Sequence, residues 1–240
     1  MLVVKNLCKH FGGIEAVKNL DFQLQGGEIL GLVGPNGSGK STTFNLITGF
    51  HPPDEGRILF KGEDITGLQP YRICRKGIGR TFQLIKPLSK MSILQNIMIG
   101  AFARTNSVEV ARKRALEQLE MTGLLGKKDL LPGELTYADR KRLELTRALA
   151  TTPDLLLLDE IAAGLNPAET QEIVRLIEEI KKSGIAMIVV EHVMDFIMSI
   201  SDRLMVLNQG IKIAEGPSED VVHDPKVVDA YLGEDYAAGQ

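Results

Sequence analysis

The sequence predicts an α/β fold with a parallel sheet, and three stretches of the chain support this prediction. Residues 28–33, apolar after Glu28, form a predicted buried strand that leads into a glycine-rich loop and a helical stretch at 41–48. Residues 155–158 are four leucines, a run of the kind that is buried on both faces of a parallel sheet. Residues 185–190 form a third apolar run after a helical pattern at 166–182. Strands that alternate with helices in this way are typical of an α/β fold.

The composition bounds the number of domains and the classes of partner. The chain has 240 residues, 44% hydrophobic and 25% charged, which favours one domain with a subdomain over two independent domains. A net charge of −3 and the absence of tryptophan argue against a nucleic-acid partner. Cys8 and Cys74 stand far apart without metal-ligand spacing, so we expect reduced thiols in a cytosolic protein.

The sequence also shows no segment that would insert into a membrane. Its first residues lack the layout of a secretory signal. No apolar run approaches the roughly 18–20 residues that span a bilayer. We therefore expect any membrane role to come through a partner.

The N-terminal region is predicted to be rich in strands. Strand-like patterns at 2–4 and 17–24 are separated by glycine turns, and residues 57–60 continue the pattern. Phe11 lies in one of these turns, upstream of the glycine-rich loop. A phenylalanine there could stack on a nucleotide base or could belong to the core, and its position leaves both interpretations open.

The glycine-rich loop at 34–42 matches the phosphate-binding pattern G-x-x-x-x-G-K-[ST]. Its residues are Gly34, Pro35, Asn36, Gly37, Ser38, Gly39, Lys40, Ser41 and Thr42. The glycines allow backbone N–H groups to point inward, beside the positive end of the following helix. Lys40 would add a positive charge for the β- and γ-phosphates. The Ser41 hydroxyl, with Thr42 beside it, is placed to ligate Mg²⁺.

The middle of the chain is predicted to be mainly helical. A strand at 78–83 ends in the polar Gln83, and a helical stretch follows at 92–123, amphipathic around Val110, Leu116 and Leu119. A further helix is expected from 135 to 150, where Thr136 and Asp139 have the spacing of a capping box. This helix start could serve only as a cap, or could also point its free N–H groups at a phosphate.

Acidic and basic side chains follow the last two apolar strands. Asp159 and Glu160 come directly after the leucine run, at the sheet edge where open α/β sheets bind ligands. Asp159 would hold Mg²⁺, and Glu160 would polarise an attacking water. His192 follows the strand at 185–190 and could reach a γ-phosphate or could be structural. A hairpin is expected at 203–213, and residues 234–240 are expected to be a frayed tail.

The order of these pieces resembles the ATP-binding subunit of ABC transporters over nearly the whole chain. More narrowly, four stretches resemble the ATPase of branched-chain amino acid importers, namely 11–17, 80–83, 142–149 and 230–233. The resemblance implies ATP and Mg²⁺ as ligands. It also implies a P-loop NTPase (RecA-like) core at 34–51, 67–83 and 151–215. An antiparallel β-subdomain would comprise 1–33 and 52–66. A helical subdomain with the signature helix would span 84–150, and a C-terminal segment would span 216–240.

The resemblance also implies a role for each candidate residue. Phe11 and Val17 would pack on adenine, and residues 34–42 would hold the phosphates. Gln83 would sense Mg²⁺ and the γ-phosphate, Asp159 would be the magnesium-side acid, Glu160 the catalytic base, and His192 a γ-phosphate contact. Lys40 and Ser41 keep the roles given above.

The implied partners lie at the membrane. Two ATPase subunits, identical or different, would clasp two ATP molecules head to tail, and the segment after Leu135 of each would face the nucleotide of the other. The subunit would lie at the cytoplasmic face of the inner membrane, where closure of the dimer would switch the conformation of two membrane permeases. A substrate-binding protein would be an indirect partner. Urea or amide import, lipopolysaccharide export and a soluble ABC-type ATPase are the alternatives. The sequence shows neither the coiled-coil insertion nor the tandem cassette that the last would usually bring.

One stretch departs from the family pattern. Where the family usually has L-S-G-G-Q, this chain has Leu135-Thr136-Tyr137-Ala138-Asp139. Ala138 adds a methyl group where the backbone must approach a phosphate, and Asp139 adds a negative charge nearby. We therefore expect that the phosphate site this segment faces is weakened.

Overall fold

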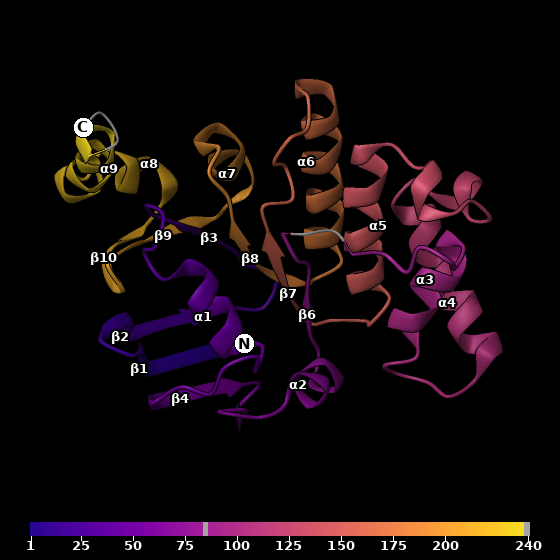
Figure 1. Ribbon diagram of the computed structural model, residues 1–240, viewed down its shortest axis with the longest axis horizontal. Coiled ribbons are helices and arrows are strands. Elements are labelled where there is room, and N and C mark those ends of the chain that lie inside the picture. Colours follow the sequence, from indigo (N-terminus) through magenta and orange to yellow (C-terminus); the bar gives the residue numbers. More distant parts are fainter. Residues whose placement is uncertain (84–85, 238–240) are drawn as a thin grey trace.

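The centre of the molecule is a largely parallel sheet. The computed structural model describes residues 1–83 and 86–237 (Figure 1). Within these residues the sheet has six strands in the order β10-β9-β3-β8-β7-β6. They are β3 (Ile29–Val33), β6 (Ile78–Arg80), β7 (Leu155–Asp159), β8 (Ala186–Val190), β9 (Arg203–Asn208) and β10 (Ile211–Gly216). The pairs from β6 to β9 are parallel, and β10 joins β9 in the predicted hairpin. Every residue of β3, β7 and β8 is buried, which confirms the interpretation of the three apolar runs.

A second, antiparallel sheet covers one face of the first. It contains β1 (Leu2–Phe11), β2 (Ile14–Leu24), β4 (Glu55–Phe60) and β5 (Glu63–Asp64) in the order β2-β1-β4-β5. Its inward side chains share one hydrophobic cluster with Leu30 and Leu32 of β3 and with Phe44 of α1 (Lys40–Ile47). The predicted β-subdomain at 1–33 is therefore wrong for 29–33, because β3 pairs with β8 and β9 in the central sheet.

Three helices cover the opposite face of the central sheet. They are α5 (Tyr137–Leu149), α6 (Pro167–Lys182) and α7 (Met194–Ile200), and Figure 1 shows them above the strands. The predicted start of α6 is confirmed, since Asn166 and Glu169 form a reciprocal capping box. Its predicted apolar stripe is buried against the sheet at Ile173, Leu176, Ile177 and Ile180.

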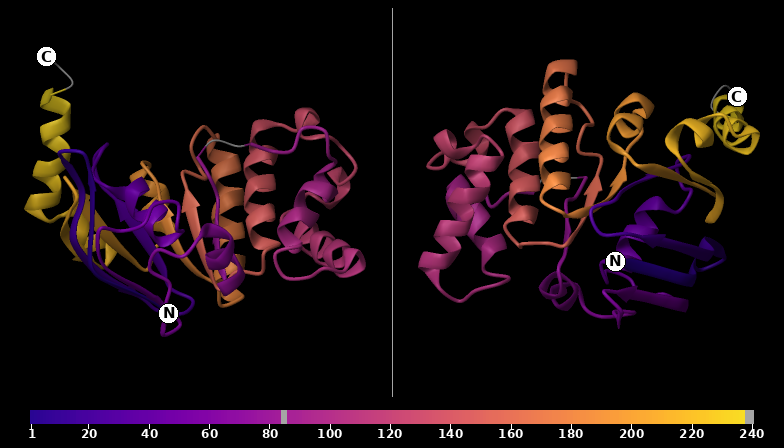
Figure 2. Two further views of the ribbon diagram at one scale, coloured as in Figure 1. Left: turned by 60° about the horizontal axis from the view of Figure 1, so that its bottom comes forward. Right: turned by 180° about the vertical axis from the view of Figure 1, so that it is seen from behind.

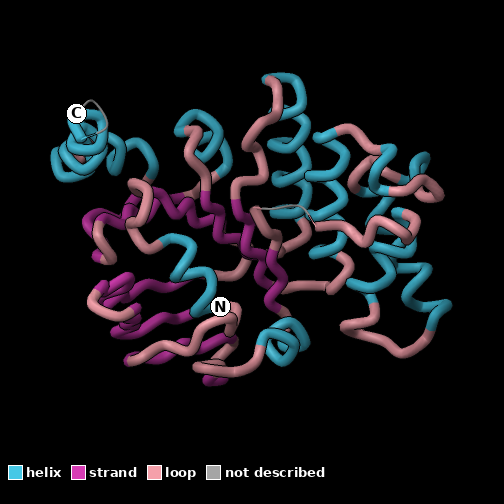
Figure 3. The backbone as a smooth tube through the Cα atoms, viewed as in Figure 1, coloured by secondary structure: helices cyan, strands magenta, loops and turns pink. Residues whose placement is uncertain are grey.

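A helical region projects from one end of the sheet, on the right of Figure 3. It contains α3 (Ile93–Ala101), α4 (Val108–Met121), the short turns η1 (Leu125–Lys127) and η2 (Pro132–Glu134), and part of α5. The predicted helical stretch at 92–123 is interrupted at 102–107. Its predicted apolar centre at Val110 is wrong, because Val110 is 40% exposed and Ala111, Ala115 and Leu119 face inward.

The remaining helices lie at the margins of the two sheets. Helix α2 (Pro70–Lys76) precedes β6, and α8 (Ser218–Val222) and α9 (Pro225–Ala237) follow β10. Figure 2 shows α9 at the end of the molecule opposite the helical region. The predicted frayed tail is wrong for 234–237, which belong to α9, and 238–240 lie outside the described residues. Among the helices that the structure describes, none has the length and apolar character to cross a membrane.

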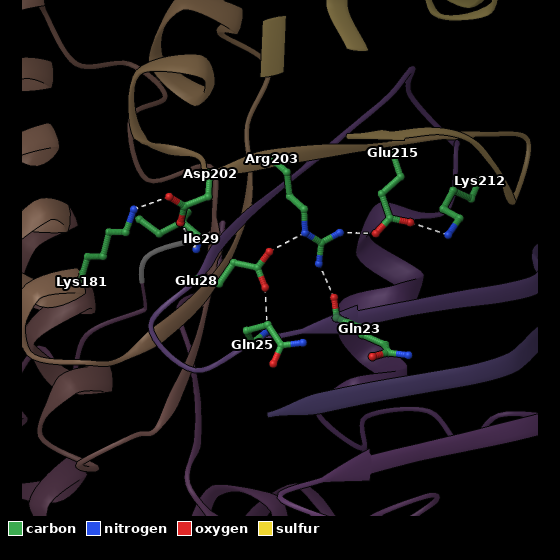
Figure 4. A network of polar contacts seen from close by, with 9 residues as sticks. All are labelled: Gln23, Gln25, Glu28, Ile29, Lys181, Asp202, Arg203, Lys212 and Glu215. Carbon is green, nitrogen blue, oxygen red and sulfur yellow. Dashed lines mark hydrogen bonds and ion pairs between the residues drawn. The ribbon is translucent and has the colours of Figure 1, made fainter. Parts of the chain in front are cut away.

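A polar network joins the two sheets at one edge (Figure 4). Arg203 of β9 contacts the carboxylates of Glu28 and Glu215 and the backbone carbonyl oxygen of Gln23 in β2. Lys212 donates a 2.6 Å hydrogen bond to the carbonyl oxygen of Asp21, also in β2. These contacts hold β2 beside the β9–β10 hairpin.

Candidate active site

The glycine-rich loop at 34–42 lies where the central sheet meets the smaller one. It connects β3 to α1, and three of its glycines have positive φ, namely Gly34, Gly37 and Gly39. A Cβ atom on Gly34 would lie 2.0 Å from the carbonyl oxygen of Leu207, and one on Gly39 would lie 2.5 Å from that of Ala16. The loop is therefore wedged between β9 and β2, and a side chain at either glycine would displace backbone.

Lys40 turns its ammonium group back onto the loop. Its Nζ donates hydrogen bonds of 2.6 Å to the carbonyl oxygen of Gly34 and 2.8 Å to that of Pro35, and lies 3.4 Å from Ser38 Oγ. The residue is 6% exposed. A positive charge is thus held within the curl of the loop, where the predicted phosphates would lie.

The Glu160 carboxylate contacts two other predicted site residues. Gln83 Nε2 donates a 2.7 Å hydrogen bond to Glu160 Oε2, and His192 Nε2 lies 3.0 Å from Glu160 Oε1. Gln83 follows β6, Glu160 follows β7 and His192 follows β8, so the parallel order of these strands brings the side chains together. Glu160 has a φ of 50°, a left-handed conformation that is uncommon for a glutamate and that clusters at active sites.

Two adjoining cavities contain these residues. The first has a volume of about 230 Å³, and its walls include the loop from Asn36 to Thr42 together with Gln83, Glu160 and His192. The second, of about 510 Å³, is lined by residues that include Ser41, Gln83 and Asp159. The structure therefore brings the loop, the two acids, the glutamine and the histidine to one place.

The second cavity offers oxygen atoms of the kind that Mg²⁺ prefers. Its lining residues include Ser41, Gln83 and Asp159, which carry a hydroxyl, an amide and a carboxylate. Within the described residues, no group of three or more His, Cys, Asp or Glu residues could hold a metal ion. The donors fit Mg²⁺, which commonly takes one or two carboxylates and completes its shell with water and phosphate oxygens.

Asp159 is buried beside Arg80, for which the sequence predicted no role. Arg80 NH2 lies 3.1 Å from Asp159 Oδ2, and both side chains are under 10% exposed. Burial raises the pKa of Asp159, and the nearby guanidinium of Arg80 opposes that shift. The backbone N–H of Asp159 donates to Thr81 Oγ1 at 3.1 Å. A charged residue in a predicted strand was the one signal that could have indicated Arg80.

Two further residues support the turn after β7, and neither was predicted. Lys141 Nζ, from α5, donates a 2.6 Å hydrogen bond to the backbone carbonyl oxygen of Glu160. Glu191, which is 2% exposed, accepts a 2.7 Å bond from the backbone N–H of Ala162. Burial raises the pKa of Glu191. Both contacts join segments far apart in the sequence, so no local pattern reveals them.

The two predicted adenine contacts differ in exposure. Phe11 lies at the end of β1, is 43% exposed, and contacts His51 edge to face with 5.3 Å between ring centroids. It is therefore not a core residue, and stacking on a base stays a prediction. Val17 is fully buried in the cluster between the two sheets, so in this structure its side chain has no surface to offer a base.

The segment 135–139 lies apart from this chain's own cavity at the phosphate loop. Thr136 caps α5, with its Oγ1 accepting a 3.2 Å bond from the backbone N–H of Asp139. The Asp139 carboxylate accepts from Lys127 Nζ at 2.5 Å and from the Thr136 hydroxyl at 2.9 Å. The capping box is thus only half formed.

Asp139 is 5% exposed and paired with Lys127, which holds the pKa of its carboxyl below the usual range. Its charge is therefore turned inward and compensated. Ala138 is also buried.

Strand, glycine loop, helix and paired acids define this protein as a P-loop nucleoside triphosphatase. A family model described as "ABC transporter" matches residues 17–163, and one described as "Branched-chain amino acid ATP-binding cassette transporter" matches residues 212–237. The chain belongs to the ABC transporter family as an ATP-binding subunit, and it is an ATP hydrolase.

Similar proteins cover the chain almost completely. The high-affinity branched-chain amino acid transport ATP-binding protein LivG of Escherichia coli (strain K12) is 40% identical over 98% of both chains. The corresponding protein BraF of Pseudomonas aeruginosa is 36% identical over 98% of both chains.

Solved structures agree with these relatives. A nucleotide-free ATP-binding cassette from an ABC transporter superposes with a TM-score of 0.88 at 35% identity, over 96% of this chain and 98% of that one. The ADP conformation of an ATP-binding cassette gives a TM-score of 0.89 at 35% identity, over 97% and 98%. A dimeric post-hydrolysis cassette bound to ADP and Pi gives a TM-score of 0.82 at 27% identity, over 91% and 99%.

Proposed function

We propose that this protein is the ATP-binding subunit of an importer for branched-chain amino acids and that it hydrolyses ATP in a head-to-tail dimer. The observation that carries the enzymatic part is the contact of Gln83 and His192 with the two carboxylate oxygens of Glu160, beside the phosphate loop. The cargo is proposed from the relatives, which are named as branched-chain amino acid transport proteins, and from the match at residues 212–237.

Glu160 has the position of a general base. Its carboxylate shares the cavity with Lys40 and the loop N–H groups, so a water beside it would face the end of a bound triphosphate. Gln83 and His192 fix the orientation of the carboxylate, and His192 could contact the γ-phosphate once the nucleotide is bound. Bound Mg²⁺ would neutralise charge on the phosphates, held by Asp159 and Ser41 with Gln83 nearby.

The dimer is proposed because one chain does not complete its own site. The segment 135–139 is not part of the described walls of the cavity at the loop. Its Thr136 caps the start of α5, and a helix start of this kind can bind a phosphate. A second ATPase subunit, placed head to tail, would bring its own segment of this kind, with Thr136 and the N–H group of Ala138, to this chain's nucleotide. A dimeric cassette among the similar structures supports this arrangement.

A groove suits a membrane permease as the second partner. It has a volume of about 350 Å³ and lies between α2, β6 and the helices α3 and α5. Its rim carries exposed apolar side chains, including Phe50, Tyr71, Phe82 and Ile99, at 39–56% exposure. Phe82 is next to Gln83 in the sequence, so a permease segment in this groove would contact the residue adjacent to the one that binds Glu160. Two such permeases would hold the ATPase at the cytoplasmic face of the membrane, and a substrate-binding protein would act through them.

The experiment that tests the enzymatic proposal is the substitution Glu160→Gln. We expect ATP turnover to fall by about 10²–10⁴-fold, the usual contribution of a general base, while ATP still binds. Gel filtration with Mg²⁺-free ATP should then show a dimer for the variant. Glu178→Gln, on the exposed face of α6, is the matched control and should keep full turnover. Full hydrolysis by Glu160→Gln would remove this residue from the mechanism.

A separate experiment tests the cargo. The ATPase would be reconstituted with its permeases and substrate-binding protein, and uptake of leucine would be compared with uptake of urea. Leucine-dependent stimulation of ATP hydrolysis is the expected result. Stimulation by urea alone would replace the cargo but leave the proposed ATPase mechanism standing.

A further inference from the structure

A buried arginine lies between the magnesium-side acid and the groove. Arg80 ends β6, and its side chain is 9% exposed. One guanidinium nitrogen, NH2, lies 3.1 Å from Asp159 Oδ2. The other, NH1, donates to Asn45 Oδ1 at 2.6 Å and lies 3.2 Å from Thr48 Oγ1. Arg80 therefore ties Asp159 to the C-terminal end of α1, the helix that follows the phosphate loop.

The same guanidinium is surrounded by aromatic rings. Its central carbon lies 5.0 Å from the ring centroid of Phe82, 5.5 Å from that of Phe44 and 5.7 Å from that of Phe50. Phe50 and Phe82 contact each other edge to face at 5.7 Å, and both line the groove. Phe82 and Arg80 also line the cavity that contains Asp159. One cationic group thus touches the wall of the groove and the acid.

Stability alone does not account for this arrangement. Arg80 Nε is buried and has no hydrogen-bond partner among the described residues. Burial lowers the pKa of the guanidinium, against the influence of Asp159. A buried ion pair gives little net stability compared with apolar side chains, and an unsatisfied donor reduces it further. A group of this kind is therefore better explained by a role at the site.

We infer that Arg80 is a positioning residue that orients the Asp159 carboxylate for Mg²⁺ and couples it to the groove through Phe82. The inference rests on the proposed function, because it takes Asp159 as the magnesium-side acid. The pair uses Oδ2 of Asp159, so it fixes the rotation of the carboxylate beside the cavity lined by Ser41 and Gln83. An occupant of the groove that displaces the Phe82 ring also displaces the guanidinium, and with it the carboxylate.

The test compares nucleotide binding with and without the metal, so that it does not depend on turnover. The affinity of the isolated subunit for a non-hydrolysable ATP analogue is measured by calorimetry in Mg²⁺ and in EDTA. For Arg80→Met we expect the affinity in EDTA to stay within about twofold of wild type. The enhancement by Mg²⁺ should fall by about 10–100-fold, as is typical when a group that orients a metal ligand is lost. An enhancement that is unchanged or larger would overturn the inference.

Two further variants keep the test decisive. Arg203→Met is the matched control, because Arg203 is also an arginine paired with carboxylates, those of Glu28 and Glu215 (Figure 4), and it lines neither of the two cavities at the phosphate loop. It should keep the wild-type Mg²⁺ enhancement even if it melts at a lower temperature. Should Arg80→Met not fold, Arg80→Lys replaces it. One ammonium cannot serve both Asp159 and Asn45 as the planar fork does, so a smaller loss of enhancement is expected, and an unchanged enhancement would again overturn the inference.

The link to the groove has its own variant. Phe82→Leu removes the nearest ring and should lower the Mg²⁺ enhancement by about twofold to fivefold, since cation–π contacts at partly exposed sites are weak. No change for Phe82→Leu would overturn the coupling but not the positioning. If the wild-type protein binds no analogue, or binds it equally with and without Mg²⁺, the proposed function itself fails. If wild type responds to Mg²⁺ and Arg80→Met responds equally, only the present inference fails.

Discussion

Lys141 Nζ donates a 2.6 Å hydrogen bond to the backbone carbonyl oxygen of Glu160. Lys141 belongs to α5, whose start carries the segment proposed to face the partner's nucleotide, and it is only 4% exposed. Glu160 adopts the left-handed conformation that places its carboxylate between Gln83 and His192. A residue of the helical region thus holds the backbone of the proposed base.

We expect Lys141→Met to lower kcat without a large effect on ATP affinity. The aliphatic part of the side chain is kept, but the bond that restrains the Glu160 turn is lost. A misplacement of about 1 Å can cost on the order of 100-fold in rate, so we expect a decrease of about 10–100-fold. Steady-state kinetics and ATP titration measure the two quantities. Lys113→Met, at an exposed position of α4, is the control. Equal kcat values for the two variants would show that the bond does not matter.

Lys40→Met should weaken ATP binding. The substitution removes the ammonium group held within the loop while keeping much of the buried aliphatic volume. A hydrogen bond to a charged group contributes about 1.5–3 kcal/mol, which corresponds to a loss of roughly 10–100-fold in affinity. Calorimetric titration with ATP checks this, and Lys5→Met at an exposed position of β1 serves as the comparison. Unchanged binding by Lys40→Met would mean that the loop does not hold the phosphates.

The stability of the protein should depend on pH through Asp54, which precedes β4 and contacts β1. Lys9 Nζ and the backbone N–H of His10 both donate to Asp54, and these contacts lower its pKa from 3.8 to about 2. A group whose pKa is lowered by folding stabilises the fold above its ordinary pKa, and this contribution is lost as pH falls from 3.8 toward about 2. Asp54→Asn should therefore lose stability less steeply than wild type over that range.

Urea unfolding at several pH values measures this slope. Asp220→Asn, an exposed acid of α8, should keep the wild-type slope. If Asp54→Asn and wild type lost stability in parallel between pH 4 and pH 2, Asp54 would not be the group responsible.

Gly31→Ala should destabilise the central sheet. A Cβ atom at Gly31 of β3 would lie 2.4 Å from Leu204 Cδ2 and 2.9 Å from Ile197 Cγ1, so these buried side chains of β9 and α7 would have to shift. Overpacking of this kind costs about 1–3 kcal/mol. At Gly133 no heavy atom lies within 4 Å of the added Cβ, so Gly133→Ala should change the free energy of unfolding little. Equal stability of the two variants, measured in urea, would contradict the prediction.

The sequence predicted those parts of the fold and site that local patterns encode. The leucine-rich strand, the Asn166 cap and the strand–loop–helix order around the glycine loop each depend on neighbours in the chain, and these structural predictions are confirmed. Gln83, Glu160 and His192 each follow a parallel strand of one sheet, and this order explains why they meet, although the contacts among them were not predicted.

Contacts between distant segments could not be predicted in the same way. Arg80 and Lys141 act on residues 79 and 19 positions away. The assignment of β3 to the smaller sheet failed because a strand's partners are set by tertiary pairing and not by its own residues. The pairing of Asp139 with Lys127 could not be predicted for a similar reason, because it joins two separate segments of the helical region.

The bonds from Lys40 to the carbonyl oxygens of Gly34 and Pro35 have a consequence for successive rounds of turnover. In the proposed mechanism, an incoming triphosphate would substitute its own oxygens for those of the backbone, so the ammonium group would not have to lose a water shell at each binding event. When the product leaves, the ammonium would return to the same carbonyl groups. The loop would then keep its shape between one nucleotide and the next and would not have to refold for each.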